Sequence, residues 1–299
     1  MLSILIPTYN YNVYPLACQL EKQALNTNIT FEIICFDDGS KSSANIENEK
    51  INQLNHSKFI ALNDNIGLSN NRNALAKASK YEYLLFIDGD SILHDNEFIL
   101  RYIKVLESNP DVIYGGRIHP DSVEPNRKLR WKYGKFIEDK SASIRKKNPY
   151  KTLMFNNTFI KKKCFNAIKF NPEIKKYGHE DTLFAYDANL SKLNVTHINN
   201  AVMHGDIDNN ETFINKTERA LVNILILYNN HKISHKFVKI LWLYDIMGSL
   251  KLNGVMAFLF DFIKQNLKKQ LSSKNPSLIL FEIYKIGYLC SLKNVSKEI

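Results

Sequence analysis

Short apolar runs alternate with amphipathic stretches over the first 115 residues of the chain. Four of the runs are almost continuously apolar and end in polar or turn-forming residues, and they span 2–6, 31–36, 58–62 and 83–87. Helical periodicity fills the intervals at 14–25, 41–54 and 68–80, and a helix at 96–108 precedes a strand at 112–114. Because near-continuous apolar strands are buried on both faces, this alternation predicts an α/β fold with a mostly parallel, Rossmann-like sheet flanked by helices.

The rest of the chain has a different pattern. Residues 117–152 lose the periodicity and gain charge, which predicts a long loop or a small insertion. Further elements are expected at 179–192 (helix) and 195–198 (strand), with a short strand before His204, followed by aromatic-rich, lysine-bordered helices at 236–247, 255–267 and 277–292. We therefore expect one α/β domain over 1–230 and a basic, aromatic-rich helical region over 231–299.

The net charge of +10 is concentrated in two blocks of the sequence. Residues 125–169 carry 14 basic and 2 acidic side chains, and residues 232–299 carry 11 and 4, so that the remaining residues are net acidic. Such blocks are typical of proteins with a polyanionic partner, and they leave anionic lipid, a phosphorylated substrate and nucleic acid open. Lysines that only solvate the surface are the alternative explanation.

The cysteines and the first residues of the chain indicate the cellular compartment in which the protein is expected. The four cysteines Cys18, Cys35, Cys164 and Cys290 lie far apart without C-x-x-C spacing, which argues against a zinc ribbon or a disulfide framework and fits a reducing compartment. The first residues lack a basic region and a long apolar core, so no secretory signal is expected. No run of about 18 apolar residues occurs, and we expect a cytoplasmic protein without a spanning helix.

Polar segments follow four of the predicted strands at the points where the strands end. They are Pro7-Thr8-Tyr9-Asn10, Asp37-Asp38-Gly39-Ser40, Asn65-Ile66-Gly67 with Arg72 in the next helix, and Asp88-Gly89-Asp90. Each segment alone is typical of a turn, because Asp, Asn and Gly favour turns. Four of them at successive strand ends indicate a ligand site, since ligands of open parallel sheets bind at the carboxyl ends of the strands.

With these segments, and with Asn71-Arg72-Asn73 and Gly178-His179-Glu180-Asp181, the chain resembles the family 2 glycosyltransferases. The resemblance covers about residues 1–205, with the motifs in the family's order and at similar spacings. It implies the GT-A fold and an inverting transferase that uses a nucleotide-diphosphate sugar, expected to be a UDP-sugar. Two features depart from the family: His179 replaces an aromatic residue or glycine, and residues 155–159 are larger than the usual small-residue acceptor loop.

The resemblance also implies a donor site. Pro7, Thr8 and Tyr9 are expected to line the pocket for the nucleotide base. Asp38 is expected to accept a hydrogen bond from the base, and Asp88 to touch the ribose side. The residues that the resemblance assigns to the donor nucleotide are Pro7, Thr8, Tyr9, Asp38, Asn65, Gly67, Arg72, Asp88 and Gly89.

Asp88-Gly89-Asp90 resembles the family's D-x-D element, in which Asp90 would bind a divalent metal. Mn²⁺ or Mg²⁺ suits this position, because hard cations prefer carboxylate oxygens and can bridge two phosphates. His204 follows a predicted short strand, where related sequences often carry a histidine, and we expect it to complete the metal shell. A structural or solvent-facing histidine is the alternative. No role is predicted for the other histidines, among them His119.

Glu180-Asp181 resembles the family's Glu-Asp pair, in which the Asp is taken as the catalytic base. Inverting transfer needs a carboxylate that removes the acceptor's hydroxyl proton while its oxygen attacks the anomeric carbon. The resemblance thus implies Asp181 as the base, with Glu180 beside it in the catalytic pair. Alternatively, both are ordinary acidic residues of a helix's first turn, where the helix dipole favours them.

The acceptor is expected to be a surface polysaccharide or a lipid-linked saccharide at the inner face of a bacterial plasma membrane. The helices of 231–299 suit contact with an anionic membrane, and packing onto the catalytic domain or a second subunit is the alternative. Two other functions stay open. Residues 86–90 also resemble the nucleophile strand of aspartyl-phosphate phosphatases. Residues 125–169 would suit a basic nucleic-acid-binding protein, but no nucleic-acid motif supports this and no such partner is expected.

Overall fold

A computed structural model describes residues 1–174 and 178–292 of the chain. Its centre is a seven-stranded sheet in the order β3-β2-β1-β4-β8-β6-β9. The strands are β1 (Leu2–Thr8), β2 (Phe31–Asp37), β3 (Ser57–Ala61), β4 (Tyr83–Ile87), β6 (Val112–Tyr114), β8 (Asn157–Lys161) and β9 (Val195–His197). Only β8 runs antiparallel to its neighbours, β4 and β6, so the sheet is mostly parallel, as the sequence predicts.

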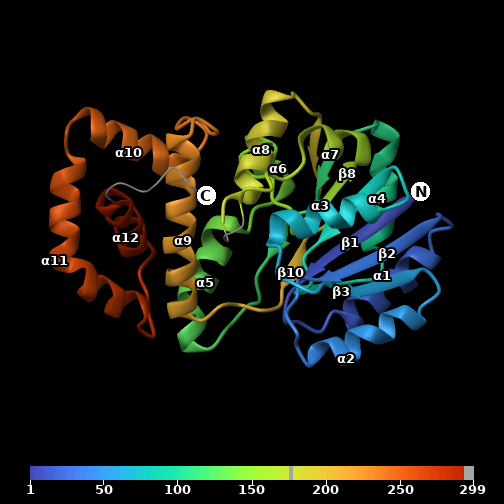
Figure 1. The fold of residues 1–299 in the computed structure, drawn as a ribbon. Helices are drawn as coiled ribbons and strands as arrows, with labels where there is room; N and C mark the ends of the chain where they lie inside the picture. The colour runs from blue at the N-terminus through green and yellow to red at the C-terminus, as the bar shows by residue number, and fades with distance from the viewer. Residues whose placement is uncertain (175–177, 293–299) are drawn as a thin grey trace.

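Helices cover both faces of this sheet (Figure 1). All seven residues of β1 are buried; Ile4 and Ile6 pack into one apolar cluster and Leu5 into a second. The first cluster includes α1 (Tyr14–Leu25) and α4 (Phe98–Val105), and the second includes α3 (Leu68–Ala78), α7 (Lys162–Ile168) and α8 (Glu180–Leu190). The predicted α/β fold is confirmed, although the helix expected at 41–54 is shorter, with α2 (Ala44–Asn48) followed by a 3₁₀ turn (Glu49–Gln53).

The central strand β8 is absent from the sequence prediction. Its five residues are all buried, although Asn157 and Thr158 are polar and give no apolar run. Asn157 is tolerated there because its amide group is fully paired: Nδ2 donates to the carbonyls of Gly116 and Asn200, and Oδ1 accepts from the Tyr102 hydroxyl. The segment that was compared with an acceptor loop is therefore largely a buried strand.

A second, smaller sheet lies beside the first. Its strands are β5 (Ser91–Ile92), β10 (Val202–His204) and β7 (Arg117–Ile118), with β10 in the middle. His204 pairs with Ser91, the residue after Asp90. The small sheet therefore brings two distant parts of the sequence together next to the end of β4.

Residues 117–152, expected to be a long loop or a small insertion, do not form a long loop. Besides β7, this segment forms a 3₁₀ turn η3 (Pro125–Arg127), α5 (Lys128–Tyr133), a π-helical turn η4 (Gly134–Glu138) and α6 (Ala142–Arg145). These elements are too short for helical periodicity to appear in the sequence. Packing holds α5 in place, because Leu129 is fully buried in a cluster with Ile214 and Phe281 from the C-terminal helices.

Four longer helices form the C-terminal part: α9 (Asn210–Asn229), α10 (Lys239–Ser249), α11 (Asn253–Leu271) and α12 (Leu278–Ser291). They lie next to the α/β part, with α10 running across the top of the view, and α9 contacts both α5 and α12 (Figure 1). The predicted C-terminal helical region is confirmed. In the described residues no helix alone has the length and hydropathy to cross a membrane, but α10 and α11 together do, with a bend of 114° between them.

Candidate active site

Three strand ends meet at one edge of the large sheet. The backbone N–H of Asp38, after β2, donates to the carbonyl of Thr8 at the end of β1 over 2.9 Å. After β4, Gly89 lies so close to β1 that a Cβ atom at this position would be 3.1 Å from Thr8 Oγ1 and 2.8 Å from Val13 Cγ1. Only glycine lets Asp88-Gly89-Asp90 lie this close. The polar segments after β1, β2 and β4 are therefore neighbours in space.

Asp38 organises the loop that precedes α3. Its two carboxylate oxygens accept hydrogen bonds from the backbone N–H groups of Ile66 (2.9 Å) and Gly67 (3.0 Å). Asn65 Oδ1 accepts a further bond from Gly67 N–H at 3.1 Å. Burial raises the pKa of Asp38, although the two N–H groups oppose the shift. Because a carboxylate oxygen has two lone pairs, each oxygen can still accept a bond from a ligand.

A buried arginine joins two of the predicted carboxylates. Arg72 is 1% exposed; its Nη2 lies 3.0 Å from Asp88 Oδ1 and its Nη1 lies 2.6 Å from Asp181 Oδ1. Burial alone would lower the pKa of Arg72, but the charges of Asp181 and Asp88 raise it. The guanidinium also lies over the rings of Phe155 and Phe170, at 5.8 and 5.2 Å from their centroids. Arg72 is thus a fixed positive charge between the ends of β4 and α8.

Asp181 and Glu180 occupy different environments at the start of α8. Asp181 Oδ1 is paired with Arg72, Oδ2 accepts from the Phe155 backbone N–H at 3.0 Å, and the side chain keeps 25% of its surface exposed. Glu180 is buried, and its Oε2 accepts from Gly178 N–H at 2.9 Å. Burial, and then the charge of Asp181, raise the pKa of Glu180 to about 7. Asp181 is therefore the carboxylate that a ligand hydroxyl can reach.

Asp90 and His204 meet where the small sheet adjoins β4. His204 Nε2 lies 3.0 Å from Asp90 Oδ2. Burial would raise the pKa of Asp90, but the hydrogen bond and the charge of His204 outweigh it, and the pKa is lowered. Within 1–174 and 178–292, no group of three or more His, Cys, Asp and Glu side chains is arranged to hold a metal. One carboxylate and one imidazole, which fit a divalent cation such as Mn²⁺, are what the chain offers here.

Behind His204 lies His119, for which the sequence predicts no role. Its Nε2 is 3.4 Å from His204 Nδ1, and its Nδ1 is 2.7 Å from Asp139 Oδ1. Burial lowers the pKa of His119, so the ring is neutral at neutral pH. Arg117 is a second residue of the site that sequence analysis did not identify. Its Nη2 lies 3.3 Å from Asp88 Oδ2. Both residues come from the segment that was expected to be a long loop or a small insertion.

Buried polar atoms without a hydrogen-bond partner gather around the strand ends. Six of the seven such atoms in the described part of the chain belong to Thr8 (Oγ1), Asp37 (Oδ1), Ser69 (Oγ), Asn71 (Oδ1), Arg72 (Nε) and Asn156 (Nδ2). All six residues lie in the predicted donor motifs or directly beside them. An unpaired buried polar atom costs about 1–3 kcal/mol, so a bound polar ligand that pairs with these atoms would remove that cost.

The remaining predicted residues lie at the same edge. Pro7 is inside β1, opposite Phe36 of β2, whereas Tyr9 follows β1 and is 58% exposed. The structure thus brings the predicted donor, metal and catalytic residues to one edge of the sheet. Their contact with a nucleotide or a metal stays a prediction.

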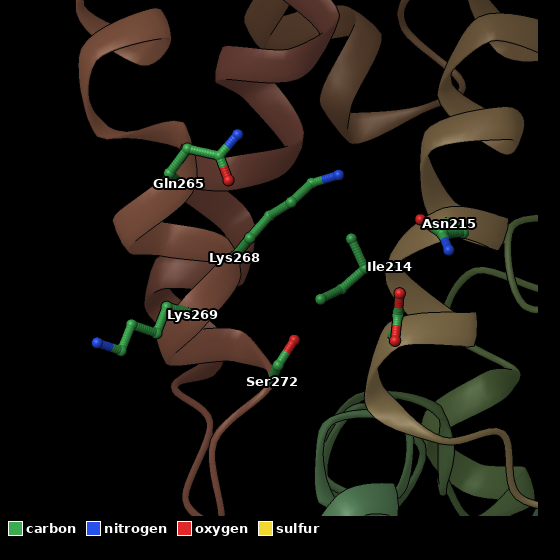
Figure 2. Close-up of a pocket in the computed structure, with 7 residues that line it drawn as sticks. Ile214, Asn215, Gln265, Lys268, Lys269 and Ser272 are labelled. Carbon is green, nitrogen blue, oxygen red and sulfur yellow. The ribbon is translucent and has the colours of Figure 1, made fainter.

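Two hollows in the surface lie elsewhere. One, of about 310 Å³, opens between α9 and α11 (Figure 2) and is lined by Glu211, Ile214, Asn215, Gln265, Lys268, Lys269 and Ser272. The other, of about 370 Å³, lies along β2 and β3 and is lined by residues such as Phe31, His56 and Lys58. Neither includes the paired carboxylates or the unpaired polar atoms, so we locate the candidate active site at the strand ends.

Comparison with known proteins gives one matching family model, that of glycosyl transferase family 2, over residues 3–171. Glycosyltransferase GlyG of Streptococcus pneumoniae serotype 4 is 25% identical over 203 residues, which are 64% of this chain and 67% of that protein. A chondroitin synthase of Escherichia coli is 25% identical over 221 residues, and the chain spans 32% of its length. The family match includes Asp88-Gly89-Asp90, which decides against the phosphatase alternative.

Solved structures show the same fold at low identity. S. aureus TarS in complex with UDP-GlcNAc has a TM-score of 0.52 and 17% identity, over 96% of this chain and 90% of that one. The mannosyltransferase PcManGT from Pyrobaculum calidifontis, in complex with GDP-Man and Mn²⁺, has a TM-score of 0.52 and 10% identity, over 74% of this chain and 61% of that one. The GT-A fold that the resemblance implied is thereby confirmed.

Proposed function

Because this chain belongs to glycosyl transferase family 2, we propose that it moves a sugar from a UDP-sugar to a saccharide or lipid-linked saccharide, with inversion at the anomeric carbon. The observation that carries the proposal is the pairing of Asp88 and Asp181 on one buried Arg72, beside polar atoms that lack partners. This edge of the sheet offers acceptors and donors for a nucleotide, a fixed base, and two ligands for a cation.

The donor is proposed to bind across the ends of β1, β2 and β4. Asp38 can accept the imide N–H of uracil, and the unpaired Thr8 Oγ1 is available to the nucleotide. S. aureus TarS, which shares the fold, binds UDP-GlcNAc, and this supports a UDP-sugar. The fold also accepts GDP-Man in PcManGT, so the base is the part of the proposal that a donor panel has to test.

Asp90 and His204 are the proposed ligands of Mn²⁺ or Mg²⁺. When bound, such an ion neutralises the charge that develops on the departing diphosphate. The carboxylate and imidazole suit Mn²⁺, and PcManGT is a protein of the same fold in complex with Mn²⁺. The described residues would supply one carboxylate and one imidazole to such an ion.

Asp181 is the proposed catalytic base. Its carboxylate takes the proton of the acceptor hydroxyl while that oxygen forms its bond to the anomeric carbon. The bond from this carbon to the diphosphate oxygen breaks, and the electron pair leaves with the nucleoside diphosphate. The contacts with Arg72 and with the Phe155 N–H fix the direction of the Asp181 carboxylate, so the base is oriented before the acceptor arrives.

A donor assay tests the reaction. The protein is incubated with UDP-, GDP- and CMP-sugars in the presence of Mn²⁺, and the released nucleotide is measured beside calorimetric binding of UDP. We expect slow hydrolysis of a UDP-sugar that EDTA abolishes. Asp90→Asn should remove most of this activity, because an amide is a much weaker ligand for a hard cation. Undiminished turnover in EDTA would contradict the proposed metal dependence. Absence of UDP binding would contradict the proposed UDP-sugar donor.

We assign catalysis to residues 1–230 and membrane contact to the helices of 231–299, of which 293–299 lie outside the described residues. On α11 an apolar stripe is exposed at helical spacing, formed by Val255, Phe258, Leu259, Phe262 and Ile263, with exposures between 42% and 71%. Trp242 on α10 and Leu250, which follows α10, are also exposed. Lysines occur on both helices, for example Lys239 at the start of α10 and Lys264, which follows Ile263 on α11. They match anionic lipid, whereas two copies of the surface would bring like charges together.

Vesicle sedimentation tests this surface. The chain should bind vesicles that contain phosphatidylglycerol and not vesicles of phosphatidylcholine alone. Phe258→Ser with Phe262→Ser should abolish the binding, and Leu190→Ser, an apolar residue that is 61% exposed on α8, should leave it intact. A dimer that these two changes dissociate, without any vesicle binding, would mean that a second copy covers the stripe. If the chain binds the anionic vesicles as expected, the proposed place of action is the inner face of the plasma membrane.

A further inference from the structure

We propose that His119 is a positioning residue that holds the proton of His204 on Nδ1. Nε2 of His204, which faces Asp90, is thereby the nitrogen that a divalent cation shared with Asp90 would bind. The inference rests on the proposed function, in which Asp90 and His204 are the metal ligands. It is carried by a chain of side chains, Asp139–His119–His204–Asp90, with separations of 2.7, 3.4 and 3.0 Å.

The first link fixes the tautomer of His119. A carboxylate can only accept, so the 2.7 Å contact between Asp139 Oδ1 and His119 Nδ1 places a proton on Nδ1. The other carboxylate oxygen, Oδ2, accepts from the His119 backbone N–H at 3.0 Å. Asp139 therefore binds the residue at two points. In a neutral ring, the proton on Nδ1 leaves Nε2 of His119 as an acceptor.

The second contact, between His119 and His204, determines which nitrogen of His204 carries a proton. His119 Nε2 faces His204 Nδ1, and because Nε2 is an acceptor, the proton between the two rings belongs to His204. Glu138 is the other charged group near His119 Nε2, at 3.7 Å, but it is held by Arg130 at 2.9 Å. With Nδ1 engaged by His119, Nε2 is the other ring nitrogen of His204; in the metal-free chain it donates to Asp90 Oδ2 over 3.0 Å, and a cation shared with Asp90 would take the place of that proton.

The surroundings of His119 prevent its ring from leaving this position. The side chain has no exposed surface. Gly134, in the π-helical turn η4, lies directly against it, and a Cβ atom on Gly134 would be 2.2 Å from His119 Nε2. The π turn and its glycine thus make the space that the imidazole occupies. A hydrogen-bonded partner that fixes the ligating histidine's tautomer changes metal affinity by roughly 10- to 100-fold.

Mn²⁺ binding tests the inference without relying on turnover. The full chain with saturating UDP is titrated with Mn²⁺, and free Mn²⁺ is read from its EPR signal. His119→Leu removes the acceptor, so the Kd for Mn²⁺ should rise about 10- to 100-fold. His119→Gln, whose side-chain carbonyl can reach the place of Nε2, should restore most of the affinity. UDP binding without metal should be the same in both variants.

His197→Leu is the matched control. His197 is also buried, at 1% exposed, and its Nδ1 and Nε2 contact Arg145 and the Pro149 carbonyl rather than the candidate site. It should leave Mn²⁺ affinity unchanged. Wild-type affinity in His119→Leu, or an equal loss in His197→Leu, overturns the positioning role. Wild-type affinity in Asp90→Asn instead overturns the metal site itself, so the two failures are distinguishable.

Histidine NMR keeps the inference testable if His119→Leu does not fold. Nitrogen-15-labelled wild-type protein with Mg²⁺ and UDP distinguishes the two tautomers of each imidazole by their ¹H–¹⁵N correlations. We expect His119 and His204 both to carry their proton on Nδ1. A proton on Nε2 of His204 in the loaded protein would overturn the proposal without any variant.

Discussion

Arg72 Nη1 lies 2.6 Å from Asp181 Oδ1, and Nη2 of the same guanidinium lies 3.0 Å from Asp88. One buried cation therefore links the proposed base to the residue proposed at the ribose side of the donor. The planar group fixes the relative position of the two carboxylates, so a displacement of Asp88 on donor binding would reach Asp181 through one rigid contact.

Removing this cation should destabilise the fold. Arg72→Leu leaves Asp88 and Asp181 without their shared partner, and breaking a buried ion pair in this way costs about 3–5 kcal/mol. Arg72→Lys should cost less, because one ammonium keeps the charge but cannot span both carboxylates. Urea denaturation measures both. Lys77→Ala on the exposed side of α3 is the control, expected within about 0.5 kcal/mol of wild type. Equal stability of Arg72→Leu and this control would contradict the assignment.

Asp181→Asn separates catalysis from binding. Loss of a positioned base should lower single-turnover transfer by roughly 10²–10⁴-fold, while the affinities for UDP and Mn²⁺ stay near wild type. Both oxygens of Asp181 accept hydrogen bonds, so the NH₂ group of asparagine must face one of two donors, Arg72 or the Phe155 N–H. This can destabilise the fold, and stability is therefore measured together with activity. Glu180→Gln is the comparison and should remain active. An inactive Glu180→Gln beside an active Asp181→Asn would exchange the two roles.

Asp38→Ala should weaken UDP binding by about 1.5–3 kcal/mol, the range for a hydrogen bond to a charged group. It should also loosen the loop before α3, because the N–H groups of Ile66 and Gly67 lose their acceptor. Calorimetry with UDP and thermal unfolding measure the two effects. Asp64→Ala, an exposed residue of the same loop, is the control. Unchanged UDP affinity in Asp38→Ala would remove this residue from the donor site.

Glu180 should make the stability of the fold depend on pH. Its folded-state pKa of about 7 lies above its ordinary value of 4.5, so between these values the folded chain binds more protons than the unfolded chain. Its contribution to stability therefore falls as the pH rises from 4.5 to 7, by about 3 kcal/mol in total. Glu180→Gln should be more stable than wild type at pH 8 and lose this advantage at pH 5. An equal difference at both values, measured in urea, would contradict the raised pKa.

The donor motifs could be predicted because they combine two strong sequence signals. Apolar runs mark the buried strands, and Asp38, Asp88 and Asp90 come directly after them, at the edge where ligands of such sheets bind. Arg72 was predicted from the resemblance to the family's helix arginine. Its pairing with Asp181 could not be predicted, because it depends on how α8 packs against α3.

His119, Arg117 and β8 were missed for physical reasons. The first two lie in or beside elements of two to six residues, in which neither periodicity nor apolar runs can develop. Their role comes from tertiary contacts with His204 and Asp88. β8 begins with Asn157 and Thr158, so its burial depends on hydrogen bonds from Tyr102 and to Gly116 that only the folded chain provides.

Because β10 is the central strand of the small sheet, it determines which part of the site can form first during protein synthesis. β5 and β7 do not pair with each other, and only β10, which lies between them, bridges them. On the ribosome, Asp38 and Asp88 can come together early, whereas Asp90 has no imidazole opposite it until the chain has been translated past His204. The nascent chain can therefore form the nucleotide side of the site before the cation side. A chain that stops before β10 has the nucleotide side but lacks the cation side.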